Sequence, residues 1–278
     1  MSEGGDPQLT GDAANDAPKA VTYTNYLKVE ELLALQELKS DPPEHDELLF
    51  IVIHQVYELW FKVLLHELDR IKVDLSAGDV YASLAGLKRA RTILKTLVAQ
   101  IDVLETMTPT EFASFRERLE SASGFQSAQF REVEFVLGYK RPELLEMHLA
   151  NPPGLARLER RLAEPSIVDA FYDFLERRGV AIPVELRDKA PEAANVPSPA
   201  IQDALVDRYH TEGDLVLLIE ALTDLDEGLQ EWRYRHVKMV ERTMGHKIGT
   251  GGSEGAEFLR RTLFHPVFPD LWEIRSRF

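Results

Sequence analysis

Two of the eight histidines occupy positions where an imidazole could take part in chemistry. His236 lies on the same helical face as Leu225, Leu229, Trp232 and Val240, because these positions recur every three or four residues. A histidine on an apolar face is desolvated, and its imidazole needs a partner. Two interpretations remain open: a core histidine bonded to a carboxylate or carbonyl, or a metal ligand, for which haem iron is one option.

The second histidine, His54, follows Phe50 by four residues, so both side chains lie on one face of a predicted helix. The run from Phe50 to Gln55 consists of four apolar residues followed by two polar ones. This pattern indicates either the wall of a pocket with one hydrogen-bonding group or a buried histidine that is satisfied within the core.

Phe112 and Arg116 repeat the four-residue spacing. An arginine beside a flat ring on an apolar face could bind a carboxylate through two N–H groups. The alternative is an ordinary surface ion pair with Glu111 or Glu120, which is the commoner arrangement.

Two further segments have residue types that suit ligands. The stretch 249–253 offers backbone N–H groups and two hydroxyls next to a predicted helix start, which suits an anion or a zwitterion, although a simple turn has the same composition. The match of 251–255 to G-x-S-x-G lacks the strand that a nucleophile elbow requires. Tyr23 to Leu27 forms an aromatic patch that is either a packing surface or a dimer arm.

Helical periodicity dominates the segments that must position these residues. Residues 1–21 have no apolar run and are predicted to be a disordered tail, and 183–200 contains four prolines and reads as an irregular connection. The remainder, 22–278, is predicted to be one all-α domain of long antiparallel helices. The predicted helices span 46–75, 79–107, 109 to about 119, a segment ending at 138, a segment opening at 142, 163–178, 211–244 and 256–264.

Composition restricts the class of protein. The 278 residues are 44% hydrophobic, which is ordinary for a globular chain. There is no cysteine, which excludes disulfides, thiolate metal sites, a thiolate nucleophile and covalent c-type haem. The net charge of −15 disfavours nucleic acid as a partner. With neither a signal segment nor an apolar transmembrane run, we expect a cytoplasmic protein with no membrane association.

Five blocks of sequence are long enough to indicate a family. From Tyr23 to Arg275 the chain resembles the tryptophan 2,3-dioxygenase family, and a paralogue within the same haem-dependent superfamily is the alternative. The matching blocks are YTNYL at 23–27, HDELLFIVIHQVYELWFK at 45–62, LETMTPTEFASFR at 104–116, SASGFQSAQF at 121–130 and WRYRHVKMVERTMGHKIGTGGSEG at 232–255.

The resemblance implies an all-α homotetramer, a dimer of dimers, with one b-type haem per subunit that is active as Fe²⁺. It implies a reaction of O₂ with L-tryptophan to give N-formyl-L-kynurenine, within the kynurenine pathway of tryptophan catabolism. It also implies roles for particular residues. His236 matches the haem ligand and His54 the histidine that bonds the indole N–H.

The other implied roles concern the substrate and the surroundings of the haem. Phe50 matches a residue that packs on the indole, Arg116 the partner of the substrate carboxylate, and Thr250 the contact of the substrate ammonium group. Ser123 and Gly124 match a loop near the haem and O₂. The N-terminal arm that completes a neighbouring subunit's pocket corresponds to Tyr23, Tyr26 and Leu27.

One departure from the family pattern concerns the substrate pocket. Phe112 stands where many bacterial members carry tyrosine, which removes one hydroxyl near the substrate carboxylate. Some superfamily paralogues that keep the same histidine and arginine oxidise modified tryptophans, or insert one oxygen atom to give 2-oxindoles. A paralogue of that kind is therefore the alternative function.

Overall fold

The computed structural model describes residues 20–245, 259–260 and 263–278. The chain divides into two compact units, Met1–Glu37 and Leu38–Phe278. In the first unit, helices α1 (Tyr23–Leu27) and α2 (Val29–Leu33) bury none of their residues. This unit therefore has no hydrophobic core of its own within its described part.

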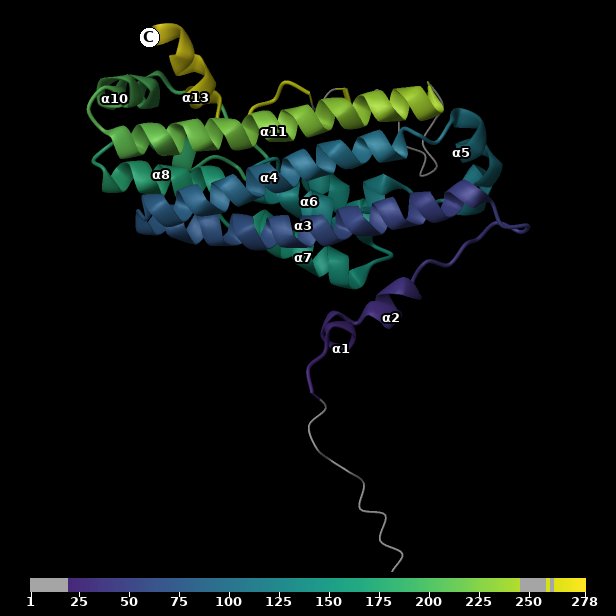
Figure 1. The fold of residues 1–278 in the computed structure, drawn as a ribbon. Helices are drawn as coiled ribbons and strands as arrows, with labels where there is room; N and C mark the ends of the chain where they lie inside the picture. Colours follow the sequence, from purple (N-terminus) through teal and green to yellow (C-terminus); the bar gives the residue numbers. More distant parts are fainter. Residues whose placement is uncertain (1–19, 246–258, 261–262) are drawn as a thin grey trace, which may run out of the picture. The chain divides into compact units, whose positions relative to one another are not determined.

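The second unit is a bundle in which three long helices, α3, α4 and α11, run side by side (Figure 1). Helices α6 and α8 pack against α3, α7 packs on α6, and α5 contacts both α3 and α11. The described residues contain no strand, which agrees with the predicted all-α class. The bounds are α3 His45–Ala77, α4 Val80–Leu104, α5 Pro109–Arg116, α6 Ala128–Val136, α7 Pro152–Ala163, α8 Ile167–Arg177, α9 Val184–Arg187, α10 Pro199–Tyr209, α11 Gly213–Met244 and α13 Pro269–Glu273, with 3₁₀ turns at Glu117–Leu119, Gly124–Gln126, Pro142–His148 and Ile274–Arg277.

Gly86 of α4 allows this helix to approach α3 closely. A Cβ atom on Gly86 would lie 2.7 Å from Cγ1 of Ile71, a fully buried residue of α3. On the α11 side, a Cβ atom on Gly228 would lie 3.4 Å from Cδ1 of Leu94, which is an ordinary contact. The α3–α4 crossing is therefore the one that depends on the absence of a side chain.

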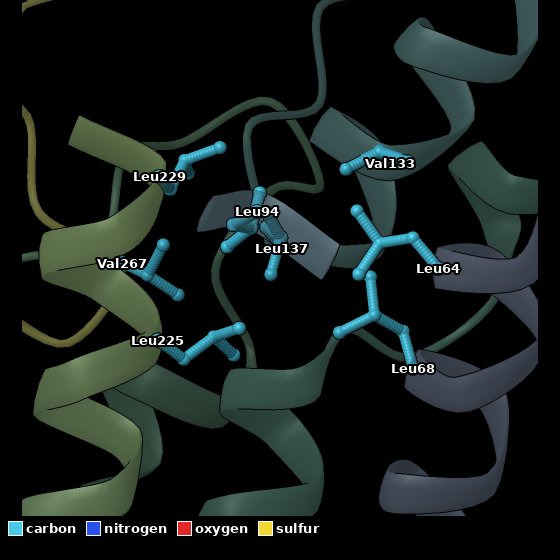
Figure 2. Close-up of a pocket in the computed structure, with 8 residues that line it drawn as sticks. All are labelled: Leu64, Leu68, Leu94, Val133, Leu137, Leu225, Leu229 and Val267. Atoms are coloured by element: carbon cyan, nitrogen blue, oxygen red, sulfur yellow. The ribbon is translucent and has the colours of Figure 1, made fainter. Parts of the chain in front are cut away.

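The centre of the bundle contains a cavity with only aliphatic walls (Figure 2). Its lining comes from α3, α4, α6, α11 and the segments that follow α6 and precede α13. An apolar cavity of this kind stays dry, because water finds no hydrogen-bond partner there. The lining residues are Leu64, Leu68, Leu94, Val133, Leu137, Leu225, Leu229 and Val267.

Helix α3 contains a long apolar stretch. Among the described helices it is the one that is long and apolar enough to span a membrane, judged by length and composition alone. In the bundle, its second half buries Leu64, Leu68 and Ile71 in the core.

Two predictions from the sequence differ from the structure. The predicted helix 163–178 corresponds to α8, which begins four residues later, at Ile167, because Ser166 starts it in a reciprocal capping box with Asp169. Residues 183–200 were predicted to be an irregular connection, but they contain α9 and the first two residues of α10. Pro199 occupies the first turn of that helix, where a missing N–H costs nothing.

Buried carboxylates hold the first and last segments of the bundle unit in place by accepting hydrogen bonds from them. At the start of α3, the Glu47 carboxylate accepts hydrogen bonds from the backbone N–H groups of Lys39, at 2.7 Å, and Ser40, at 3.0 Å. Near the other end of the chain, the fully buried Asp226 carboxylate of α11 accepts the backbone N–H of Phe268, at 3.1 Å, and the indole N–H of Trp272, at 3.0 Å.

Candidate functional site

Helix α5 brings two phenylalanines to the start of α3. As the sequence predicts, Thr108 and Glu111 form a capping box that starts α5 at Pro109. The helix places the Phe112 ring 5.7 Å from the Phe50 ring, and Phe115 lies 5.5 Å from both. The three rings form a phenylalanine cluster, with Met239 and Met244 of α11 packed against the same group of residues. The cluster provides a flat, apolar wall.

His54 lies directly beside this phenylalanine cluster. Its ring is 4.1 Å from the Phe50 ring, and Nδ1 lies 2.7 Å from the Phe50 carbonyl oxygen. A carbonyl can only accept, so Nδ1 carries the proton and Nε2 is left as an acceptor. The side chain remains solvent-accessible, but the surrounding protein lowers its pKa below the usual value of 6.5. His54 therefore presents a neutral imidazole that can accept an N–H hydrogen bond.

His236 lies on α11 among aromatic side chains. Its ring stacks on the Trp232 indole, with centroids 5.2 Å apart and an interplanar angle of 5°. No group in the described part of the chain hydrogen-bonds this imidazole, so the expected carboxylate or carbonyl partner is not found there. Burial lowers its pKa to about 4, and repulsion by His54 and Arg131 adds to the shift. Tyr57, three residues after His54 on α3, lies 6.5 Å from the Trp232 ring on which His236 stacks.

Arg116 is the last residue of α5 and is half-buried. The Glu111 carboxylate, one of the two partners considered for Arg116, accepts the Thr108 backbone N–H at 2.7 Å. The structure thus places a guanidinium group on the same short helix as Phe112, at the edge of the phenylalanine cluster.

The loop before α6 is tied to α3. Ser123 caps the turn Gly124–Gln126, and a Cβ atom on Gly124 would meet nothing within 4 Å. Glu58, one helical turn after His54, accepts a hydrogen bond from the hydroxyl of Ser127, the residue that caps α6. Open space therefore adjoins Gly124, and the loop is held one turn from His54.

The remaining expected residues lie in the first unit or outside the described residues. Tyr23, Tyr26 and Leu27 form part of α1 in the first unit, where they are 77%, 74% and 46% exposed. Thr250 lies outside the described residues, together with the rest of 249–253.

Comparison with known proteins identifies the family. The sequence model of tryptophan 2,3-dioxygenase matches residues 9–151 and 199–278. A protein of that name from Herpetosiphon aurantiacus is 58% identical over 258 residues, covering 93% of this chain and 98% of the relative. Another, from Anaeromyxobacter dehalogenans, is 52% identical over 268 residues, covering 96% and 99%. A third, from Kineococcus radiotolerans, is 43% identical over 277 residues, covering 97% and 95%.

This chain belongs to the tryptophan 2,3-dioxygenase family. It is therefore an enzyme, an oxidoreductase of the dioxygenase type. The expected resemblance and the expected fold are both confirmed.

Sequence reasoning missed two charged residues of this tryptophan 2,3-dioxygenase family member that lie next to the site. Glu58 holds the loop before α6, and Arg131 lies in the pocket that contains His236. Glu58 interrupts an apolar helical stretch, whereas Arg131 is followed directly by Glu132. A charge in an apolar stretch must be paired or placed for a purpose, so this signal could have found Glu58 but not Arg131.

Proposed function

We propose that this enzyme is a haem-dependent dioxygenase that inserts both atoms of O₂ across the indole C2–C3 bond of L-tryptophan, giving N-formyl-L-kynurenine. The observation that carries the proposal is a pair of imidazoles with lowered pKa values, His54 of α3 beside the phenylalanine cluster and His236 of α11 stacked on Trp232. One imidazole suits iron, and the other suits an indole N–H. The relatives that cover the whole chain are named tryptophan 2,3-dioxygenase, which supports this substrate.

The residues at His236 fit a b-type haem. Iron binds the neutral imidazole, and a pKa of about 4 keeps His236 in that form at neutral pH. In the described part of the chain, no three His, Asp or Glu side chains gather to hold a metal by themselves. Haem needs only one axial side chain, and a chain without cysteine cannot attach it through thioethers. The open space at Gly124 leaves room for the Ser123–Gly124 loop to lie against a flat group.

When bound, ferrous haem supplies the site at which O₂ is activated. The chain's own residues orient the substrate. The unprotonated Nε2 of His54 accepts the indole N–H, and Phe50 packs on the indole ring. These contacts fix the C2–C3 bond in one place and exclude water from it. We assign His54 the role of an orienting group, since a low pKa makes it a weak base.

We assign the enzyme's selectivity for an amino-acid substrate to the residues around Arg116. Arg116 binds the substrate carboxylate with two N–H groups, and Phe112 forms the apolar surface beside it. Thr250 is proposed to contact the ammonium group. Because Phe112 has no hydroxyl, Arg116 carries more of the carboxylate recognition than it would beside a tyrosine.

A neighbouring subunit is proposed to complete the pocket. The apolar side chains of Tyr23, Tyr26 and Leu27 are exposed on α1, and the first unit has no core within its described part. An arm of this kind gains stability by packing on another chain. We therefore propose a homotetramer, a dimer of dimers, in which the arm of one subunit covers the site of the next.

Product mass spectrometry tests the proposed reaction. The haem-loaded, reduced, full-length protein is mixed with L-tryptophan and isotopically heavy O₂. A product equal to tryptophan plus two heavy oxygen atoms supports the dioxygenase. Addition of a single oxygen atom indicates the 2-oxindole-forming alternative. No product from a haem-replete protein contradicts tryptophan as the substrate and directs the search to substituted tryptophans.

A further inference from the structure

A buried cluster of arginines lies next to His236. The carboxylate of Glu134 on α6 accepts hydrogen bonds from Arg131 of the same helix, from Arg141 at 2.7 Å and from Arg233 of α11 at 3.3 Å. Arg131, Glu134 and Arg233 are 3%, 2% and 4% exposed. Solvent therefore screens these charges far less than it screens a surface pair.

Arg131 and His236 line the same pocket, together with Glu134 and Arg233. The Arg131 guanidinium lies 5.2 Å from the centroid of the Phe130 ring. Phe130 lies 4.9 Å from Trp232, which stacks on His236. The Phe130 and Trp232 rings therefore connect the guanidinium to the imidazole through a chain of contacts.

We propose that Arg131 raises the reduction potential of the haem held by His236 and so favours the ferrous state. This inference rests on the proposed function, in which His236 holds a haem. Ferric haem carries one more positive charge than ferrous haem. A fixed positive charge nearby therefore disfavours the ferric form, and an arginine keeps its charge at every working pH. Charge and burial around a haem are established means of setting its potential.

The size of the effect follows from Coulomb's law. A unit charge roughly 10 Å away in a medium of effective dielectric constant about 20 changes an equilibrium by roughly tenfold. For a one-electron couple, a tenfold change corresponds to about 59 mV. Removal of the Arg131 charge is therefore expected to lower the midpoint potential by about that amount.

Spectroelectrochemical titration of the haem-loaded, full-length protein tests the proposal, with dithionite as the reductant and mediator dyes. Arg131→Gln removes the charge, and Arg131→Lys keeps it. We expect Arg131→Gln to make the ferric form about tenfold more favourable, which lowers the midpoint potential. We expect the midpoint potential of Arg131→Lys to lie near that of the wild type. Glu134→Gln removes a negative charge from the same cluster and is expected to shift the potential upward.

Arg157→Gln is the matched control. Arg157 of α7 donates to Glu132 of α6 at 2.7 Å, so this variant also breaks an arginine–glutamate pair on α6. Glu132 and Arg157 do not line the pocket of His236, and the variant is expected to leave the potential unchanged. Glu134 retains Arg141 and Arg233 as partners in Arg131→Gln, which favours folding of that variant.

Three results would overturn the inference. The first is a folded, haem-loaded Arg131→Gln protein with the wild-type potential. The second is an equal shift in Arg131→Lys and Arg131→Gln, since packing rather than charge would then be responsible. The third applies if Arg131→Gln does not fold. It is a Glu134→Gln protein whose midpoint potential falls or stays unchanged. A wild-type protein that binds no haem, or a His236→Gln variant that keeps a native haem spectrum, refutes the proposed function instead.

Discussion

The state of His236 predicts how the stability of the haem-free protein depends on pH. Burial lowers the pKa of this imidazole from 6.5 to about 4. Below pH 6.5 the unfolded chain takes up a proton that the folded chain does not bind. The free energy of unfolding therefore falls as the pH is lowered from about 6.5 to about 4, and this contribution levels off below that.

The magnitude follows from the size of the shift. Each pKa unit corresponds to about 1.36 kcal/mol, so the full effect is about 3 kcal/mol. Between pH 7 and pH 5 it amounts to about 2 kcal/mol. Replacing His236 with glutamine removes this contribution, while other buried groups keep theirs.

Urea unfolding of the full-length, haem-free protein at these two pH values measures the effect. The wild-type protein should lose about 2 kcal/mol more than His236→Gln on acidification. His66→Gln, at an exposed position on α3, is the control and should follow the wild type. An identical loss in wild type and His236→Gln would refute the assignment of a buried, neutral imidazole to His236.

Three further outcomes are expected. Arg116→Gln should raise the KM for L-tryptophan by about tenfold or more, whereas tryptamine, which lacks the carboxylate, should be handled alike by both proteins in steady-state assays. Gly86→Ala should destabilise the fold by about 1 kcal/mol, because its methyl group meets Ile71 at 2.7 Å, whereas Gly228→Ala should be neutral or stabilising in the same urea titration. Asp226→Ala should cost about 3 kcal/mol and lower the Tm, since it leaves a backbone N–H and an indole N–H of the C-terminal segment without their acceptor.

Local patterns gave the helices that position the site, because periodicity and capping act over a few residues. The capping box at Thr108 and the four-residue spacing of Phe50 and His54 both appear in the structure as predicted. The start of α8 was predicted four residues too early, because apolar residues stand on both sides of Ser166. The helix at Pro199 was missed because a proline that ends one segment can also begin the next.

The contacts between helices could not be predicted from spacing. Nothing local brings α5 to the start of α3, or places Arg131 in the pocket of His236. The pairing of three arginines with Glu134 depends on residues up to 99 positions apart in the sequence. The roles of the site residues came from the family resemblance, and the geometry adds the neutral state of the two imidazoles.

The two backbone hydrogen bonds to Glu47 have a mechanical consequence. They fasten Lys39 and Ser40 to the first turn of α3, just after the boundary between the two units at Glu37 and Leu38. A force applied to the N-terminal unit is therefore resisted by the hydrogen bonds to the Glu47 carboxylate before it acts on Phe50. The helix that carries the site can therefore keep its register when the chain before Lys39 shifts.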